Sequence, residues 1–242
     1  MTHGYEDLAG RAPKKVVHSL YDLGELATRL ESPNTFDRLG DTMFMDSFEY
    51  NMGHWEISTG GTASSADLSE LAVRSKRYSC KMDAGNVANA SVQITAYNPY
   101  PYATRLGLEF SIAMQYTDDQ WELILYIIKD SKRYKAEIGY HHPSNVLYYI
   151  DESNNPVELE NAYLIFAWFK NFYTYKMVVD IETMQYVRVL AYGKLWDLEG
   201  KNLYYDDVEM NNHLEIAIKY TALTVNTKTC FVDDVILTQN EP

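Results

Sequence analysis

Apolar and polar residues alternate with a period of two along most of this chain, and this alternation is the feature that most restricts its fold. In the run RLGLEFSIAMQY, residues 105–116, every second residue is apolar. Successive side chains of a β-strand point to opposite faces, so the run predicts a strand with one buried face. The apolar positions of that face are Leu106, Leu108, Phe110, Ile112 and Met114.

Roughly a dozen such runs follow one another from residue 42, about 8–12 residues apart, without a regular helical pattern between them. Antiparallel strands joined by tight turns, each with one apolar face, pack as a sandwich or a barrel. The segment 163–169 (YLIFAWF) fits either a buried strand or a helical turn. The predicted strands are 43–49, 72–82, 91–97, 105–116, 121–128, 132–140, 146–150, 172–181, 185–192, 194–198, 213–222 and 230–238.

Residues 1–41 lack this alternation and are predicted to form an N-terminal arm with a short helix, ahead of one domain over residues 42–242. Ser19 is a candidate N-cap for that helix, and the sequence Ser-Pro-Asn at residues 32–34 ends it. A helix this short is unstable alone in water, so we expect it to dock on the body or on a partner. The residues available for that contact are Leu20, Leu23, Leu26 and Leu30.

The charge balance excludes two classes of partner. The 242 residues include 21 Lys and Arg against 34 Asp and Glu, a formal net charge of -13. Binding to phosphates requires a basic surface, so we expect no nucleic-acid partner and no anionic membrane partner. The N-terminus has no signal-peptide pattern, and no stretch of ~18 apolar residues could span a membrane.

The cysteines and tyrosines give weaker indications. Cys80 and Cys230 both lie in strand-like runs, as two buried thiols or as one bridge between neighbouring strands. The 21 tyrosines exceed the 8 phenylalanines and suit a broad sheet, because tyrosine has an apolar ring and a polar tip. Such a sheet meets a sugar, another protein, or only water.

Four motifs, in this order, resemble the jelly-roll sandwich shared by carbohydrate-binding modules and concanavalin-A-like lectins. They are MDSFEYNMGHWEIS (45–58), SKRYSCKM (75–82), YKMVVDIETMQYVRVL (175–190) and CFVDDVILTQ (230–239). The resemblance covers residues 42–238. It implies an all-β fold, a jelly-roll β-sandwich of two antiparallel sheets that follows the N-terminal arm.

The two ends of the chain also resemble small structural proteins of tailed bacteriophages, such as capsid decoration proteins. The segments that carry this likeness are ELATRLESPNTFDRLGDTMFMDSFE (25–49) and the C-terminal VDDVILTQNEP. The resemblance implies a non-enzymatic virion protein, assembled in the host cytoplasm, that decorates or stabilises a capsid or tail. Its partners would be the major capsid protein or other virion subunits, with further copies of itself as a homo-oligomer.

The resemblance to sugar-binding modules also implies a structural calcium held by acidic residues of the first and last strands. The candidates are Asp46, Glu49 and Asp234. Calcium takes six to eight oxygen ligands. Strand alternation places Asp233 and Asp234 on opposite faces, and it favours Asp234 as the exposed one. The alternative is that these carboxylates accept backbone N–H groups in turns.

No pattern of residues predicts catalysis. Jelly-roll glucanases carry an E-x-D-x-x-E strand with its acids on one face, and this chain lacks it; Glu109 is the lone acid of its strand. His141 and His142 are adjacent, and adjacent residues of a strand point to opposite faces, so the pair would chelate a metal poorly. Pro143, which follows them, favours an exposed loop. We therefore expect no enzyme, although a glycoside hydrolase of the jelly-roll type remains an alternative.

A lectin-like carbohydrate-binding module is the other alternative. Sandwiches grip sugars with aromatic platforms and polar neighbours. The candidate platform residues are Tyr97, Tyr100, Tyr102 and Trp168, which equally suit a patch that faces another protein. Tyr148 and Tyr149 are adjacent in a strand, so only one of them can face outward.

Overall fold

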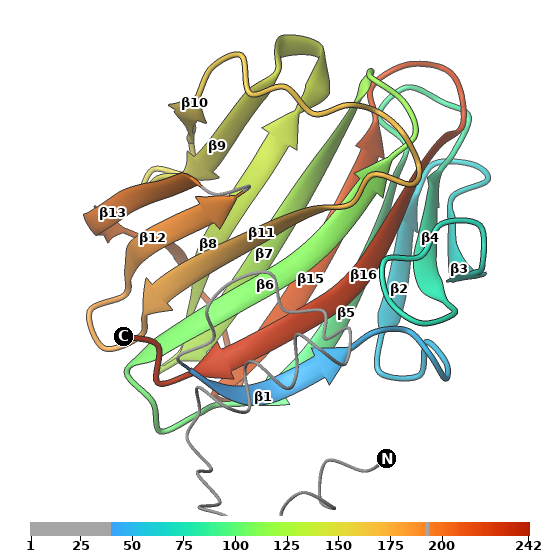
Figure 1. Cartoon of the computed structure of the whole chain (residues 1–242). Helices are drawn as coiled ribbons and strands as arrows, with labels where there is room; N and C mark the ends of the chain where they lie inside the picture. Colours follow the sequence, from blue (N-terminus) through green and yellow to red (C-terminus); the bar gives the residue numbers. More distant parts are fainter. Residues whose placement is uncertain (1–39, 192–193) are drawn as a thin grey trace, which may run out of the picture. The chain divides into compact units, whose positions relative to one another are not determined.

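A computed structural model describes residues 40–191 and 194–242, and within them it contains sixteen β-strands and one short 3-10 helix (Figure 1). The elements are β1 (Asp41–Asp46), β2 (Glu56–Gly60), β3 (Ser65–Ser69), β4 (Ser79–Ala84), β5 (Ser91–Pro99), β6 (Arg105–Met114), β7 (Asp119–Lys129), β8 (Lys132–His141), η1 (His142–Ser144), β9 (Val146–Ile150), β10 (Pro156–Glu160), β11 (Tyr173–Asp180), β12 (Gln185–Ala191), β13 (Lys194–Asn202), β14 (Tyr204–Asp207), β15 (His213–Ala222) and β16 (Lys228–Gln239).

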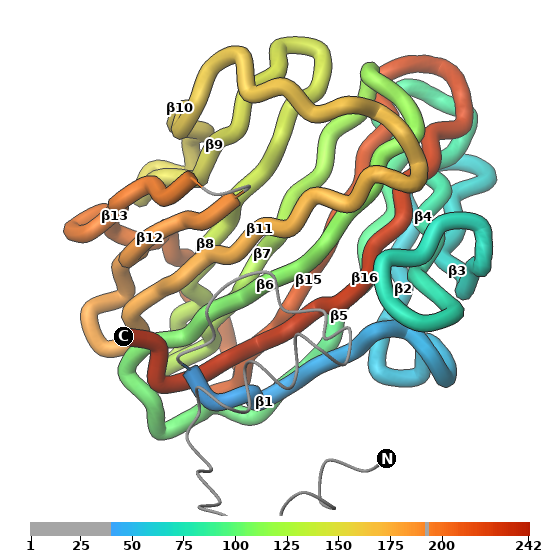
Figure 2. The backbone as a smooth tube through the Cα atoms, in the orientation of Figure 1, coloured from blue at the N-terminus to red at the C-terminus, as the bar shows by residue number. Residues whose placement is uncertain are grey.

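The strands form two antiparallel sheets. Sheet A has the order β13-β12-β11-β6-β16-β4-β3, with β1 also paired to β16. Sheet B has the order β10-β9-β8-β7-β15-β5-β2, with β14 also paired to β8. The last strand, β16, thus lies between β6 and β4 and pairs with the first strand, as the tube in Figure 2 lets the reader follow. The expected sandwich of two antiparallel sheets is confirmed.

The core lies between the two sheets and contains the apolar positions that the alternation predicts. Leu106, Leu108, Phe110, Ile112 and Met114 of β6 are all buried there. The Trp121 ring of β7 packs across the core on Phe110, at a centroid distance of 5.1 Å, and on Tyr175, at 4.5 Å. Aromatic contacts between facing sheets therefore join the two layers.

The structure has four strands that the sequence pattern misses: β2, β3, β10 and β14. All five residues of β2 are exposed, and β10 and β14 are short and only half-buried. β2 and β10 end the order of sheet B, and β3 ends that of sheet A. A strand at the edge of a sheet does not need a continuous apolar face, so its sequence does not show the alternation of apolar and polar residues. The ambiguous segment 163–169 is irregular, with Tyr163 and Ile165 buried and Leu164, Phe166 and Trp168 exposed.

The expectation that Asp234 is exposed is wrong. The register of β16 against β6 shifts between Asp233 and Ile236, and Asp234 has φ 53°. This bulge breaks the alternation, so that both aspartates are fully buried. Their carboxylates bind the same loop: Asp233 accepts the N–H groups of Arg74 and Ser75, at 2.9 and 3.1 Å, and Asp234 accepts the Ser75 hydroxyl.

Other predictions have mixed outcomes. Cys80 and Cys230 are buried free thiols. The predicted contact residues Leu20, Leu23, Leu26 and Leu30 lie outside the described residues, so the arm and its boundary stay predictions. Among the described residues, no helix has the length and apolar character that crossing a membrane requires.

Candidate functional site

The outer face of sheet B, which points away from sheet A, carries polar residues in register across four strands. Lys219 of β15 lies opposite Glu122 of β7, Glu122 opposite Gly139 of β8, and Gly139 opposite Tyr148 of β9. The alternate residues of these strands, such as Trp121 and Tyr140, point into the core. The period of two therefore places Lys219, Glu122 and Tyr148 together on one face.

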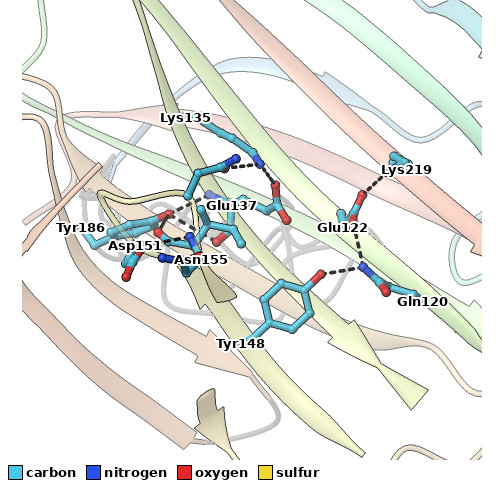
Figure 3. A network of polar contacts seen from close by, with 11 residues as sticks. Gln120, Glu122, Lys135, Glu137, Tyr148, Asp151, Asn155, Tyr186 and Lys219 are labelled. Atoms are coloured by element: carbon cyan, nitrogen blue, oxygen red, sulfur yellow. Dashed lines mark hydrogen bonds and ion pairs between the residues drawn. The ribbon is translucent and has the colours of Figure 1, made fainter. Parts of the chain in front are cut away.

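Tyr148, Gln120, Glu122 and Lys219 form a continuous chain of contacts (Figure 3). The Gln120 Nε2 group donates to the Tyr148 hydroxyl at 2.9 Å and to Glu122 Oε1 at 2.7 Å. The other oxygen of Glu122, Oε2, lies 2.9 Å from the Lys219 ammonium. Each group therefore fixes the next one, and the Tyr148 hydroxyl keeps its own proton for another acceptor.

A second ion pair lies beside this chain. The Lys135 ammonium is 2.6 Å from Glu137 Oε2 and donates to Asn154 Oδ1 at 3.2 Å. Glu137 is buried. Burial, reinforced by the nearby Glu122 carboxylate, raises the pKa of Glu137, and Lys135 opposes that shift. The carboxyl groups of Glu122 and Glu137, from the neighbouring strands β7 and β8, thus lie close enough for the charge of one to raise the pKa of the other.

Gly139 is required by the position of Tyr148. A Cβ atom at Gly139 would collide with the Tyr148 phenol and lie 2.9 Å from the Trp121 carbonyl oxygen. The phenol thus occupies the space above a strand residue that has no side chain. Tyr148 is 6% exposed, and its burial raises the pKa of the phenol well above its usual range.

Tyr148 lines a hollow of about 500 Å³ together with the polar side chains described above from β7 and β8. Its rim includes His141, whose Nδ1 atom is 2.8 Å from the Ser144 hydroxyl. Fixed hydrogen-bonding groups therefore surround a space of the size of a small-molecule site. The lining residues are Gln120, Glu122, Lys135, Glu137, His141, Ser144, Val146, Tyr148, Ile150, Asn154, Pro156 and Glu158.

The strands beneath the hollow are braced from the other sheet. The Tyr186 hydroxyl, from β12 of sheet A, accepts the Glu137 N–H at 2.8 Å and donates to the Ile150 carbonyl at 2.9 Å. Asp151 Oδ1 accepts the N–H groups of Ser153 and Asn155, which closes the turn after β9. The hydroxyl and the turn hold β8 and β9 in place, and Figure 3 shows Tyr186 beside Glu137.

The predicted calcium ligands are engaged elsewhere. Asp46 accepts the Phe48 N–H at 2.7 Å and the Trp55 indole N–H at 2.8 Å. Glu49 Oε1 accepts two backbone N–H groups, those of residues 77 and 78, at 2.8 and 3.0 Å. Asp234 forms an ion pair of 2.6 Å with Arg74. Over residues 40–191 and 194–242, no group of three or more acidic, His or Cys residues could hold a metal.

The four candidate platform aromatics do not form one surface. Tyr97 lies on the outer face of sheet B, half-exposed, and its hydroxyl donates to Glu56 at 2.9 Å. Trp168 packs on Phe169, whose ring contacts Phe231 of sheet A. Tyr100 and Tyr102 lie in the loop between β5 and β6. Only Tyr97 is therefore placed on the same face as the hollow.

The expectation of an exposed histidine loop is wrong for His142. This side chain is buried, with its Nδ1 atom 3.1 Å from Asp119 Oδ1 and its ring against Tyr140. The chain turns into η1 at this point, so His142 points into the protein and His141 lines the hollow. The sequence motifs do not single out four further residues of the hollow: Gln120, Glu122, Lys135 and Glu137.

The sequence feature that marks these four residues is their position on the polar face of the alternating segments 119–129 and 132–141.

Comparisons with known proteins identify the architecture. No family model matches the chain, and no curated protein sequence matches it. Solved structures do: the cellulose-induced protein Cip1 is 16% identical, with a TM-score of 0.53 over 81% of this chain and 96% of its own. An endo-beta-1,4-glucuronan lyase from the fungus Trichoderma reesei is 11% identical, with a TM-score of 0.58 over 82% and 96%.

A third structure, reported for endo-acting O-glycanases of the human gut microbiota, is 10% identical, with a TM-score of 0.52 over 83% of this chain and 100% of its own. The chain has the jelly-roll β-sandwich fold. Similarities at such low identity show the fold of this jelly-roll protein. Its activity has to be argued from the residues of the site.

Proposed function

We propose that the protein binds carbohydrate in the hollow around Tyr148. The observation that carries this proposal is the fixed polar lining over the outer face of sheet B. A sugar presents hydroxyl groups that donate and accept hydrogen bonds at defined angles. Gln120, Glu122 and Lys219 are already held in place, so binding does not require their ordering.

The fold supports the same conclusion by analogy. Two of the structures named above are, by name, enzymes that act on glycans, a glucuronan lyase and O-glycanases. Superposed folds often host different activities, so this analogy supports the class of ligand and no particular sugar.

Binding to a glycan array and affinity electrophoresis in polysaccharide gels test the proposal. We compare the full chain with Tyr148→Phe, which removes one hydroxyl from the hollow. Tyr149→Phe is the matched control, because it makes the same chemical change on the adjacent residue, which faces the core. Binding that is weakened about tenfold by the first variant and unchanged by the second supports the proposal. An array without any retained glycan, or equal effects of the two variants, contradicts it.

Glycan cleavage is a second candidate, favoured by Glu122 and Glu137, two of the three glutamates that line the hollow. Hydrolysis of a glycosidic bond uses one carboxyl that holds a proton at working pH and one carboxylate. Burial raises the pKa of Glu137, which suits the proton donor. Glu122, beside Lys219, would be the partner carboxylate.

The release of reducing ends from a bound polysaccharide tests this candidate. We expect Glu137→Gln to abolish release and to keep binding, because the amide preserves the shape of the side chain. If the unmodified protein releases no reducing ends from a polysaccharide that it binds, cleavage is rejected.

The virion role and the virion location remain predictions from sequence resemblance. Their residues, Leu20, Leu23, Leu26 and Leu30, lie outside the described part of the chain. A virion role and binding of carbohydrate in the hollow do not exclude each other.

A further inference from the structure

We infer that the ligand is an extended chain of neutral sugars, and that a second hollow beside Tyr97 and His213 holds its far end. This inference rests on the proposed carbohydrate binding in the first hollow. It adds the length of the ligand, its charge, and a binding subsite.

The second hollow lies where β15 begins. It has a volume of about 580 Å³ and is lined by Ser131, Glu209, Met210, Asn211 and His213. Two contacts tie its loops together: the Val208 N–H donates to the Ser131 carbonyl at 2.9 Å, and the Asp130 N–H donates to Asn212 Oδ1 at 3.0 Å. These bonds give the hollow a defined shape.

His213 belongs both to this hollow and to the outer face of sheet B. It has the same parity in β15 as Lys219, which binds Glu122 of the first hollow. Its ring lies between two acceptors, with Nδ1 2.6 Å from the Asn211 carbonyl oxygen and Nε2 2.9 Å from Glu215 Oε1. The two hollows therefore open on the same face.

Tyr97 supplies an exposed ring at the edge of the second hollow. Its centroid is 6.1 Å from that of His213, and the side chain is 55% exposed. The hydroxyl donates to Glu56 at 2.9 Å, and this bond raises the pKa of the phenol. A ring that is held at its tip and exposed at its face stacks on the C–H side of a sugar without a large loss of entropy.

The strand register gives the distance between the two hollows. Tyr97 lies opposite Glu215, Glu215 opposite Tyr126, and Tyr126 opposite Lys135, which lines the first hollow. Neighbouring strands are ~4.8 Å apart, so three steps separate Tyr97 from Lys135 by ~14 Å. This span exceeds a single sugar ring, and it suits an oligosaccharide that lies across the strands.

The charges near Tyr97 favour neutral sugars. Glu209 lines the second hollow, and Glu56 and Glu215 bind Tyr97 and His213. None of the described residues that line this hollow is a lysine or an arginine. A uronate at this position would meet carboxylates of its own sign. Lys135, which lines the first hollow, is paired with Glu137, and Lys219 is paired with the lining residue Glu122.

Isothermal titration calorimetry with a series of oligosaccharide lengths tests the inference. The probes are cello-, xylo- and manno-oligosaccharides of two to six units, with oligoglucuronates of the same lengths as the anionic comparison. We compare the full chain with Tyr97→Ala, Tyr97→Phe and Tyr148→Phe.

We expect the affinity for a neutral series to rise with length until both hollows are filled. Tyr97→Ala should weaken the longest oligosaccharides about tenfold and leave the shortest unchanged. Tyr97→Phe should retain most of the affinity, because it keeps the ring and loses only the hydrogen bond to Glu56. Tyr148→Phe should weaken every length.

Each contrary result has its own meaning. Affinity that does not depend on length, or that Tyr97→Ala lowers equally for all lengths, overturns the second subsite and leaves the first. Tighter binding of the oligoglucuronates overturns the neutral ligand. Binding of no probe overturns both the second subsite and the proposed function.

Discussion

The contact between Gly139 and Tyr148 leads to a quantitative prediction about Gly139→Ala. The added methyl group would collide with the Tyr148 phenol and lie 2.9 Å from the Trp121 carbonyl oxygen, an atom of the backbone that cannot rotate away. Overpacking of this kind destabilises by about 1–3 kcal/mol. For a domain of this size, the loss corresponds to a decrease in Tm of roughly 2–12 °C.

Urea denaturation followed by circular dichroism measures the effect. Gly60→Ala is the matched control, a strand glycine whose added Cβ would lie 2.8 Å from the Ser91 hydroxyl, which can rotate. We expect the control to change the free energy of unfolding by less than about 0.5 kcal/mol. Equal stability of the two variants would refute the close approach.

A double-mutant cycle then separates the two collisions. Combining Gly139→Ala with Tyr148→Ala removes the phenol and leaves the Trp121 carbonyl. We expect the combined loss to be smaller than the sum of the single losses by more than about 0.5 kcal/mol, because the phenol no longer meets the methyl group. Simple additivity would show that Tyr148 does not lie over Gly139.

Three further predictions concern charge, metal and the arm. Burial, and to a lesser extent the neighbouring Asp234 carboxylate, raise the pKa of Asp233 to about 7. The contribution of Asp233 to stability is therefore fully present below pH ~4, the pKa of an unfolded aspartate, and is lost as the pH rises through about 7. The free energy of unfolding of Asp233→Asn should therefore fall less between pH 4 and 7 than that of the unmodified protein, and equal pH profiles would contradict this. Asp46 and Glu49 already accept N–H groups, so added calcium or a chelator should not change Tm, and a calcium-dependent increase would restore the predicted site. Deletion of residues 1–40 should leave a folded body, by circular dichroism, that no longer assembles, and normal assembly of the truncated body would exclude the arm as the contact.

The sequence predicts the interior strands well because each has one buried face. The runs 105–116 and 213–222 alternate through their full length, and the structure places β6 and β15 there. The same pattern does not predict an edge strand such as β2, because β2 is exposed throughout and has no buried face. It does not predict the left-handed conformation of Asp234 either, since a bulge depends on the twist of the neighbouring strands and not on the local alternation of residues.

The site is harder to predict than the fold because it is assembled across strands. Glu122 and Glu137 belong to β7 and β8, and no spacing within either strand shows that they share a hollow. The search for an acidic pair within one strand therefore misses them. The sequence shows that only one of the adjacent Tyr148 and Tyr149 faces outward, but Gln120, which binds the Tyr148 hydroxyl, lies on a strand two places away in the sheet.

The brace made by Tyr186 has a consequence for redesign. Because this hydroxyl ties β8 and β9 from the opposite layer, the residues that face a ligand do not themselves maintain the shape of the cavity wall. Side chains such as Gln120 or Ser144 can then be exchanged to alter the chemistry of the lining while β8 and β9 stay in place. Library mutagenesis of the hollow should accordingly leave β12 unvaried.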